Sequence, residues 1–431
     1  MRFCMVTTFY PPYHFGGDAI FVQQLSNELA KRGHHVEVVH CRDSYDFMNG
    51  GRSAGISRNH PNVRVHTLES SVGVLSPLAT HQTGRPFFKS SALKEILERP
   101  FDVIHFHNIS LVGGPGVLRY GRAVKLYTLH EYWLVCPTHM LFKYDREPCL
   151  ERQCFACAVF HKRPPQIWRY TNLMEKSVKH IDLFLAPSAF IAQKHHELGF
   201  NIPTVELPYF SCRWESQPLP CKQVAETPFY FLFVGRLEKI KGVQTLIPLF
   251  RRHAKAQLRI VGTGHYETAL RRMAAGSPNI RFLGHQSGEK LRLLYDEALA
   301  TIVPSLWHEV FGIIILESLS RTTPVIVRNR GGMPQIIAES GGGMIFDTDE
   351  QLLDAMEALM ASAELRRKLG QEGYAAFNRR WTADAHIPRY LSLVNAALTH
   401  RSANVGDATN KACEVEAKKA TAAIVEHTAA H

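Results

Sequence analysis

The sequence predicts an α/β protein with two domains, each built on a parallel sheet that helices cover on both faces. Short apolar segments rich in β-branched residues alternate with segments of helical periodicity, which is the pattern of repeated β–α–β units. This alternation starts twice, at Met1 and again at Phe229, and the Pro- and Ser-rich stretch 208–228 separates the two halves. The 431 residues are enough for two hydrophobic cores.

The composition is that of a globular protein, with 45% hydrophobic and 21% charged residues. The net charge of +11 suits anionic small molecules, nucleic acid or an anionic membrane face. No interleaved basic and aromatic patch accompanies this charge, so nucleic acid is not expected as a partner. No apolar run reaches the roughly 18 residues of a membrane span. Nine scattered cysteines favour a reducing compartment, and the N-terminus has the pattern of a strand, so a cytoplasmic location is expected.

The first half begins with a buried strand at 1–8, a loop that carries Gly16 and Gly17, a helix at 19–32 and a strand at 35–40. The glycine pair stands at the start of the helix, where a residue without a side chain lets the backbone approach a phosphate group. A tight turn explains the pair equally well.

The poorly patterned region 43–90 is interpreted as a long loop over a sheet edge, interrupted by one strand at 63–68. The remaining predicted elements of this half are a helix at 93–98, strands at 103–107, 123–129, 183–186 and 204–207, and helices at 169–179 and 188–198.

Three histidines, His105, His107 and His130, lie near the ends of the strands predicted at 103–107 and 123–129. Open parallel sheets bind their ligands at the C-terminal ends of the strands. A single histidine in such a position is more often structural, but three that converge favour a functional role for at least one of them.

Four cysteines, Cys136, Cys149, Cys154 and Cys157, follow with the spacing C-x12-C-x4-C-x2-C. Four soft ligands within one short segment could hold a structural zinc ion, which would stabilise a loop that has no core of its own. Free thiols or a redox pair are the alternatives, and an iron–sulfur cluster is the least favoured one.

The second half repeats the alternation. Its predicted strands are 229–234, 258–261, 280–283, 300–304 and 323–327, and its predicted helices include 243–253, 290–298, 350–360, 364–377 and 383–398. The sequence Asp347-Thr348-Asp349 has the form of a metal-binding DxD motif, but it directly precedes a helix, so an N-cap is the better interpretation.

The segment from 303 to 339 has the strongest functional pattern. A loop with Glu309 leads through Val310, Phe311 and Gly312 into an apolar helix that carries Glu317. Main-chain N–H groups at a helix start favour an anion. Carboxylates on both sides suggest that hydroxyl groups are held as well, which fits a diphosphate between two polyols, a nucleotide sugar. An ordinary strand–helix–strand unit is the alternative.

A strand-to-helix loop, VGRLEKIKG, carries Arg236 and Lys241. Both side chains could neutralise the charge that develops on a departing diphosphate. The alternative is a solvated basic loop.

Together these segments resemble the retaining glycosyltransferases of family 4, which have the GT-B fold of two Rossmann-like domains facing a central cleft. The resemblance rests on Glu309-x7-Glu317, on VGRLEKIKG, on Gly16-Gly17 before the first helix, on Gly331-Gly332 and on PSAFI at Pro187. These motifs occur in the family's order and cover nearly all of the chain from Met1 to about Leu398.

The resemblance implies a role for each matching residue. It implies that Glu309 binds hydroxyl groups of the sugar, that Glu317 binds the ribose, and that His130 lies beside the donor sugar and the acceptor. It implies that Arg236 and Lys241 hold the diphosphate. The phosphate-binding turns would be formed by Gly16, Gly17, Val310, Phe311 and Gly312. It also implies a hexose transfer with retention of configuration, without a cofactor or a divalent metal in the chemistry.

The expected domains are 1–207 on the acceptor side, with the cysteine loop 136–157, a linker at 208–228, and 229–380 for the nucleotide sugar. A helix at 381–399 is expected to pack back toward the first domain, and a disordered tail is expected at 400–431. The expected partners are a UDP- or GDP-sugar, a glycan or lipid-linked acceptor, and a peripheral contact with the inner membrane face. A nucleotide-sugar epimerase or a phosphorylase of the same fold is the alternative function.

Overall fold

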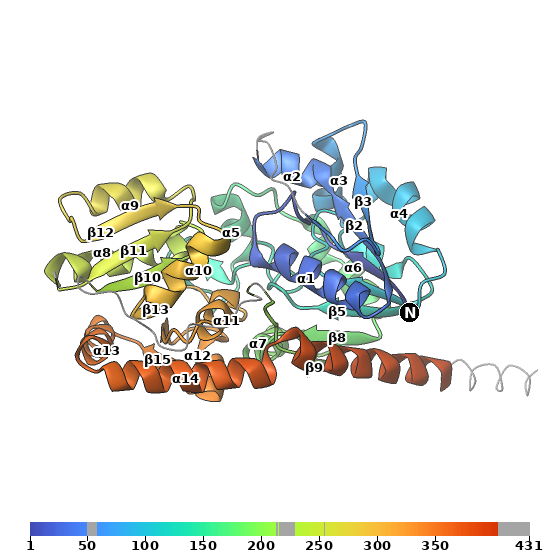
Figure 1. Ribbon diagram of the computed structural model, residues 1–431. Helices are drawn as coiled ribbons and strands as arrows, with labels where there is room; N and C mark the ends of the chain where they lie inside the picture. The colour runs from blue at the N-terminus through green and yellow to red at the C-terminus, as the bar shows by residue number, and fades with distance from the viewer. Residues whose placement is uncertain (50–57, 213, 215–228, 254, 404–431) are drawn as a thin grey trace, which may run out of the picture.

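A computed structural model describes residues 1–49, 58–212, 214, 229–253 and 255–403, and Figure 1 shows their arrangement as two α/β domains. In these residues the first sheet has seven parallel strands. Their spatial order is β3 (Val63–Leu68), β2 (His35–Cys41), β1 (Arg2–Val6), β4 (Val103–Phe106), β5 (Val124–Thr128), β8 (Leu183–Ala186) and β9 (Thr204–Glu206).

The second sheet has six parallel strands within the described part of the chain. Their spatial order is β12 (Ile280–Gly284), β11 (Gln257–Val261), β10 (Tyr230–Val234), β13 (Ala300–Val303), β14 (Val325–Arg328) and β15 (Gly343–Phe346). In both sheets the strand order reverses beside the first strand of the domain, which gives each sheet the switch point of a Rossmann-like fold. The predicted fold class is therefore confirmed.

Helices connect the strands of both sheets. Those of the first domain are α1 (Gly17–Lys31), α2 (Arg42–Asn49), α3 (Leu75–Thr83), α4 (Ser90–Leu97), α5 (Cys154–Phe160), α6 (Leu173–Val178) and α7 (Ala189–Glu197), with 3-10 turns η1 (Phe87–Lys89), η2 (Pro115–Arg119) and η3 (Ile167–Tyr170). Those of the second are η4 (Lys239–Lys241), α8 (Val243–Arg252), α9 (Glu267–Met273), α10 (Gly288–Glu297), α11 (Ile313–Leu319), α12 (Met333–Ser340), α13 (Asp349–Ala361) and α14 (Ala363–Arg380).

Helix α1 shows how the sequence produces these elements. Its residues Phe21, Val22, Leu25 and Leu29 recur at helical spacing and are all buried. The core that they join continues across the domain boundary to Phe311 of the second domain. The two domains therefore share apolar contacts at the point where the candidate site residues lie.

The helix formed by residues 383–403 returns along the first domain, as the red helix beside β8 and β9 in Figure 1 shows. The hydroxyl of Tyr390 bonds to Nδ1 of His105 at 3.0 Å, and Arg401 forms an ion pair with Asp182 at 2.9 Å. These contacts anchor the end of the described chain to the first domain. The disordered tail was predicted at 400–431, but residues 400–403 still belong to this helix. Residues 404–431 and most of the predicted linker lie outside the described residues.

Two further predictions of local structure are wrong. In the described part of region 43–90, helices α2 and α3 lie where the sequence presented loop, although β3 lies where it was predicted. Buried Ser76 and Thr80 on α3 show why, since small polar side chains on an inward face conceal helical periodicity. The helix predicted at 169–179 is divided into η3 and α6.

Two capping predictions are confirmed. The side chain of Ser188 accepts a hydrogen bond from the N–H of Ile191 at the start of α7. Thr348 forms a capping box with Gln351 at the start of α13, so the DxD-like sequence belongs to a helix start. No helix in the described part of the chain has both the length and the apolar character needed to span a bilayer.

Candidate functional site

An ion pair between Glu309 and Lys241 stands at the centre of the candidate site. The Lys241 ammonium lies 2.6 Å from Oε1 of Glu309, and the hydroxyl of Ser305 donates to the same oxygen at 2.7 Å. Glu309 belongs to the loop between β13 and α11, and Lys241 ends η4. Both side chains are largely buried, with 11% and 19% of their surfaces exposed. The pair joins two separate loops of the second domain.

Burial acts to raise the pKa of Glu309, but the charge and hydrogen bond of Lys241, together with Ser305, outweigh it and lower the pKa below 4.5. A lowered pKa in the folded state means that the carboxylate contributes stability above pH 4.5, and that this stability is lost as the pH falls through the lower value. Glu309 is thus an ionised, fixed carboxylate at neutral pH.

The glycine pair Gly331-Gly332 supports the main chain of Glu309. Gly331 has φ +66°, and a Cβ atom there would lie 2.1 Å from the carbonyl oxygen of Glu309. The N–H of Gly332 donates to that same carbonyl at 2.7 Å. Only residues without side chains fit against the loop this closely, so the pair fixes the position of the carboxylate.

The turn Val310-Phe311-Gly312 joins this loop to α11 and is held by the first domain. Ser188 donates to the carbonyl of Val310 at 2.6 Å, and the ring of Tyr209 packs 5.3 Å from the ring of Phe311. Gly312 has φ +100° and occupies the N-cap of α11. The helix therefore begins where the two domains meet.

The predicted loop Gly16-Gly17 lies on the other side of this meeting point. Gly16 is the N-cap of α1, and a Cβ atom on Gly17 would lie 3.3 Å from Cδ1 of Ile313, the first residue of α11. The starts of two helices from different domains thus come together. Each helix start carries unpaired N–H groups and a partial positive charge, so their meeting point favours an anion.

Glu317 lies on α11, eight residues after Glu309. It is buried, with 4% exposure, and its Oε2 accepts a hydrogen bond from the hydroxyl of Tyr295 at 2.9 Å. A buried carboxylate that is held by a hydroxyl donor is suited to accept further hydrogen bonds from hydroxyl groups of a ligand.

Arg236 differs from the other predicted site residues. Its guanidinium forms an ion pair with Glu238 at 2.8 Å, and half of its side chain is exposed. The structure places Arg236 at the end of β10 but pairs it with a neighbour in its own loop, so only Lys241 of the predicted basic pair contacts Glu309.

The three histidines of the first domain converge as predicted. Nδ1 of His107 lies 2.8 Å from Nε2 of His130, and the ring centroids of His105 and His107 are 4.0 Å apart. Nδ1 of His130 lies 2.5 Å from the hydroxyl of Tyr209. Both ring nitrogens of His130 are therefore engaged within the protein, and through Tyr209 this histidine contacts the ring of Phe311 indirectly.

Buried neutral histidines predict a loss of stability in mild acid. Burial lowers the pKa of His130, His195 and His386 from 6.5 to about 4, so below pH 6.5 the unfolded chain binds protons that the folded chain excludes. For each of these histidines, the free energy of unfolding should fall by about 1.4 kcal/mol for every unit by which the pH drops between 6.5 and about 4. Urea unfolding at pH 7 and pH 5 measures this, and equal free energies at the two values would contradict it.

Several residues of the site carried no recognisable sequence pattern. Tyr132, whose hydroxyl donates to the carbonyl of His308 at 3.0 Å, connects the first domain to the loop of Glu309. Ser305, Tyr295 and Tyr209 hold the site residues through single hydrogen bonds or ring contacts. Such contacts depend on tertiary structure. Among these residues, only Ser305 lies close in sequence to a motif residue, four positions before Glu309.

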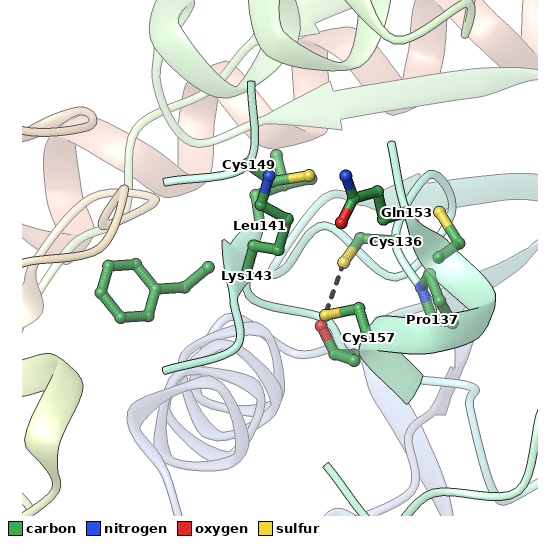
Figure 2. A pocket seen from close by; sticks show the side chains of 10 residues that line it. Cys136, Pro137, Leu141, Lys143, Cys149, Gln153 and Cys157 are labelled. Carbon is green, nitrogen blue, oxygen red and sulfur yellow. Dashed lines mark hydrogen bonds between the residues drawn. The ribbon is translucent and has the colours of Figure 1, made fainter. Parts of the chain in front are cut away.

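The four cysteines line one small pocket in the first domain, shown in Figure 2. They are free thiols, and the Sγ atom of Cys136 lies 3.3 Å from the hydroxyl of Thr138. Among the residues that the structure describes, no three His, Cys, Asp or Glu side chains are gathered tightly enough to form a ready metal site. The pocket is separate from the Glu309–Lys241 pair, since no residue is common to both.

Comparisons with known protein families agree with this architecture. The family described as "Glycosyltransferase Family 4" matches residues 15–206, and the family "Glycosyl transferases group 1" matches residues 220–376. The two matches correspond to the two Rossmann-like domains, and the second includes Lys241, Glu309 and Glu317.

Individual relatives match over much of the chain. An uncharacterised glycosyltransferase of Methanocaldococcus jannaschii is 27% identical over 369 residues, which cover 80% of this chain and 84% of the relative. An O-antigen chain mannosyltransferase C of Escherichia coli is 28% identical over 244 residues, 54% of this chain and 66% of the relative.

Solved structures share the fold. Sucrose-phosphate synthase of Thermosynechococcus elongatus superposes with a TM-score of 0.73 at 18% identity, covering 93% of this chain and all of the other. The Anabaena protein HepE in complex with UDP superposes with a TM-score of 0.64 at 15% identity, covering 92% and 100%. The matched families and the two-domain fold together show that the chain is a glycosyltransferase of the GT-B fold, similar to family 4.

Proposed function

We propose that the protein transfers a hexose from a UDP- or GDP-sugar to a glycan or lipid-linked acceptor, with retention of the anomeric configuration. The observation that carries this proposal is the meeting of the starts of α1 and α11, with the Glu309–Lys241 pair beside it and Glu317 on α11. One anion-binding point next to two fixed carboxylates matches a diphosphate between two polyols.

The diphosphate would lie at the two helix starts. There the N–H groups of the turns at Gly17 and Gly312 would donate to phosphate oxygens, and Lys241 would supply a full positive charge. Arg236 would have to exchange its partner Glu238 for phosphate, which its half-exposed side chain allows. Because these groups supply the positive charge, we propose that the chemistry needs no divalent metal and no cofactor.

The two carboxylates would hold the two polyols. Glu317, buried and fixed by Tyr295, would accept hydrogen bonds from the ribose hydroxyls. Glu309 would accept hydrogen bonds from hydroxyls of the sugar while Lys241 turns toward the phosphate. The positive charge of Lys241 would then stabilise the negative charge that develops on the leaving diphosphate during transfer.

The reacting bond would be that between the anomeric carbon and the diphosphate. The acceptor hydroxyl would attack from the same face as the leaving diphosphate, whose oxygen takes the acceptor proton as the bond breaks. His130 would position the turn through Tyr209 and Phe311, because both of its ring nitrogens already have partners in the protein.

The first domain would bind the acceptor, and the O-antigen chain mannosyltransferase among the relatives supports a role in polysaccharide or glycoconjugate synthesis. The net charge of +11 supports a peripheral contact with an anionic membrane face. Failure to sediment with anionic liposomes at low salt would contradict that contact.

Thermal unfolding with nucleoside diphosphates tests the donor site. A ligand at 100 times its Kd should stabilise the protein by about 2.7 kcal/mol, so UDP or GDP should raise the Tm. With the matching sugar donor and an acceptor, NMR should show a product of unchanged anomeric configuration, and EDTA should not reduce its rate. Product formed without an acceptor would indicate an epimerase, dependence on free phosphate a phosphorylase, and either result would contradict the proposal.

A further inference from the structure

The pocket of the four cysteines is formed by one short segment of the first domain, residues 136–157, that folds back on itself. Cys136 follows the turn that begins at Tyr132, Cys149 follows the short strand β7 (Glu147–Pro148), and Cys154 and Cys157 belong to α5. Figure 2 shows Cys136, Cys149 and Cys157 around the same small space. The fold thus brings to one place all four thiols of the C-x12-C-x4-C-x2-C pattern.

The spacing within α5 places two thiols on one face of the helix. Cys154 and Cys157 are three residues apart, and side chains at this separation lie one above the other. The main chain of the same segment also turns sharply: the N–H of Cys136 donates to the carbonyl of Tyr132 at 2.7 Å, and that of Cys149 to the carbonyl of Leu141 at 2.8 Å. The second of these bonds brings Cys149 back to the chain at Leu141.

The segment has little regular secondary structure. Strands β6 (Phe142–Lys143) and β7 have two residues each. Four non-glycine residues of the segment have a positive φ angle, which is unfavourable for residues with a side chain; they are His139, Leu141, Tyr144 and Asp145. Large apolar side chains remain exposed, among them Leu150 at 84%. Of its larger apolar side chains, Leu141 and Phe142 are buried against the domain. A short irregular segment with so few buried side chains gains stability from a crosslink or a metal.

A partly buried cation lies near the pocket. The guanidinium of Arg169 lies over the rings of both Trp133 and Trp168, at 5.2 and 4.7 Å from their centroids. Its hydrogen bonds go to the carbonyls of Trp133 and Leu134 and to the amide oxygen of Gln166. Within the described residues no ion pair joins Arg169 to a carboxylate, and Glu131 acts on its charge only from farther away. Negative charge in the neighbouring pocket would therefore add a favourable interaction.

We propose that Cys136, Cys149, Cys154 and Cys157 bind one zinc ion as thiolates. Binding would release the four thiol protons to solvent and leave a site with a net charge of −2. Arg169, with the nearby Lys143 and Arg152, would offset that charge. The thiol side chains are not in ligand geometry in the structure, so they would have to turn toward a common centre, where Zn–S distances are about 2.3 Å.

The zinc would have a consequence for the candidate site. Cys136 lies in the same turn as Tyr132, whose hydroxyl holds the carbonyl of His308 next to Glu309. A metal that fixes this turn would fix the contact between the domains. The inference does not depend on the proposed sugar transfer, since metal content and thiol reactivity are measured without substrate.

Elemental analysis of the full chain, purified without chelators, tests the proposal. One zinc per chain is expected, and a thiol-modifying mercurial should release it in step with the modification of four thiols. Cobalt substituted for zinc should show the absorption bands of tetrahedral thiolate coordination. Absence of stoichiometric metal, or a disulfide among these cysteines in the mass spectrum, would overturn the proposal.

The variants Cys154→Ser and Cys157→Ser should lose the metal and become sensitive to proteolysis between Tyr132 and Phe160. Cys212→Ser, outside the pocket, is the matched control and should keep the metal. Full zinc content in both pocket variants would overturn the proposal. If these variants fail to fold, the release experiment on the natural chain decides the question.

Discussion

The Glu309→Gln variant is expected to transfer sugar about 10²–10³-fold more slowly than the natural enzyme, because a preorganised charged contact to the transition state is lost. The amide keeps the shape of the side chain, and its oxygen can still accept from Ser305 or Lys241. What it loses is the negative charge beside the reacting carbon. Steady-state kinetics should show the loss in kcat, with a small change in the Kd for the nucleoside diphosphate.

The control for this variant is Glu357→Gln on α13. Glu357 is well exposed, with 60% of its side chain accessible, and lies 4.0 Å from His253 rather than near the site. Its activity should equal that of the natural enzyme. A Glu309→Gln variant with normal kcat would mean that the ionised carboxylate has no part in transfer.

Replacing Lys241 with alanine is expected to affect both stability and activity. The change leaves the Glu309 carboxylate buried without its counter-charge, which should destabilise the protein by about 3–5 kcal/mol. Ser305 retains one hydrogen bond to that carboxylate, so the loss of unfolding free energy should lie near the lower end of this range. Affinity for the nucleoside diphosphate should fall as well. Urea unfolding and calorimetric titration measure the two effects separately.

A double-mutant cycle separates the ion pair from the phosphate contact. In Lys241→Ala with Glu309→Gln the buried charge is gone, so stability should recover relative to Lys241→Ala alone, while activity should remain lost. Lys239→Ala, at an exposed position of the same loop, should change stability by less than about 0.5 kcal/mol. Equal instability of the single and double variants would show that the pair is not coupled.

Elements with strong patterns could be predicted from the sequence. The strand β3 was found inside a poorly patterned region, and the convergence of His105, His107 and His130 followed from the rule that parallel strands end at one edge. Helices α2 and α3 were missed because polar residues on their inner faces hide the apolar period. Local periodicity therefore fails where a helix buries small polar side chains.

The candidate site was predictable in its residues but not in its pairings. Motif order identified Glu309 and Lys241, yet only the fold shows that they form an ion pair of 2.6 Å, whereas Arg236 pairs with Glu238. The role of Tyr209, which links His130 to Phe311, could not be read from the chain because its partners are 79 and about 100 positions away. Pairings of this kind are decided by tertiary packing.

A crystal structure with UDP or GDP bound would show whether the two helix starts form the diphosphate site. The diphosphate should lie at the starts of α1 and α11, with Lys241 on a phosphate oxygen and Glu317 on the ribose hydroxyls. A nucleotide bound elsewhere, or one that contacts neither Lys241 nor Glu317, would contradict it.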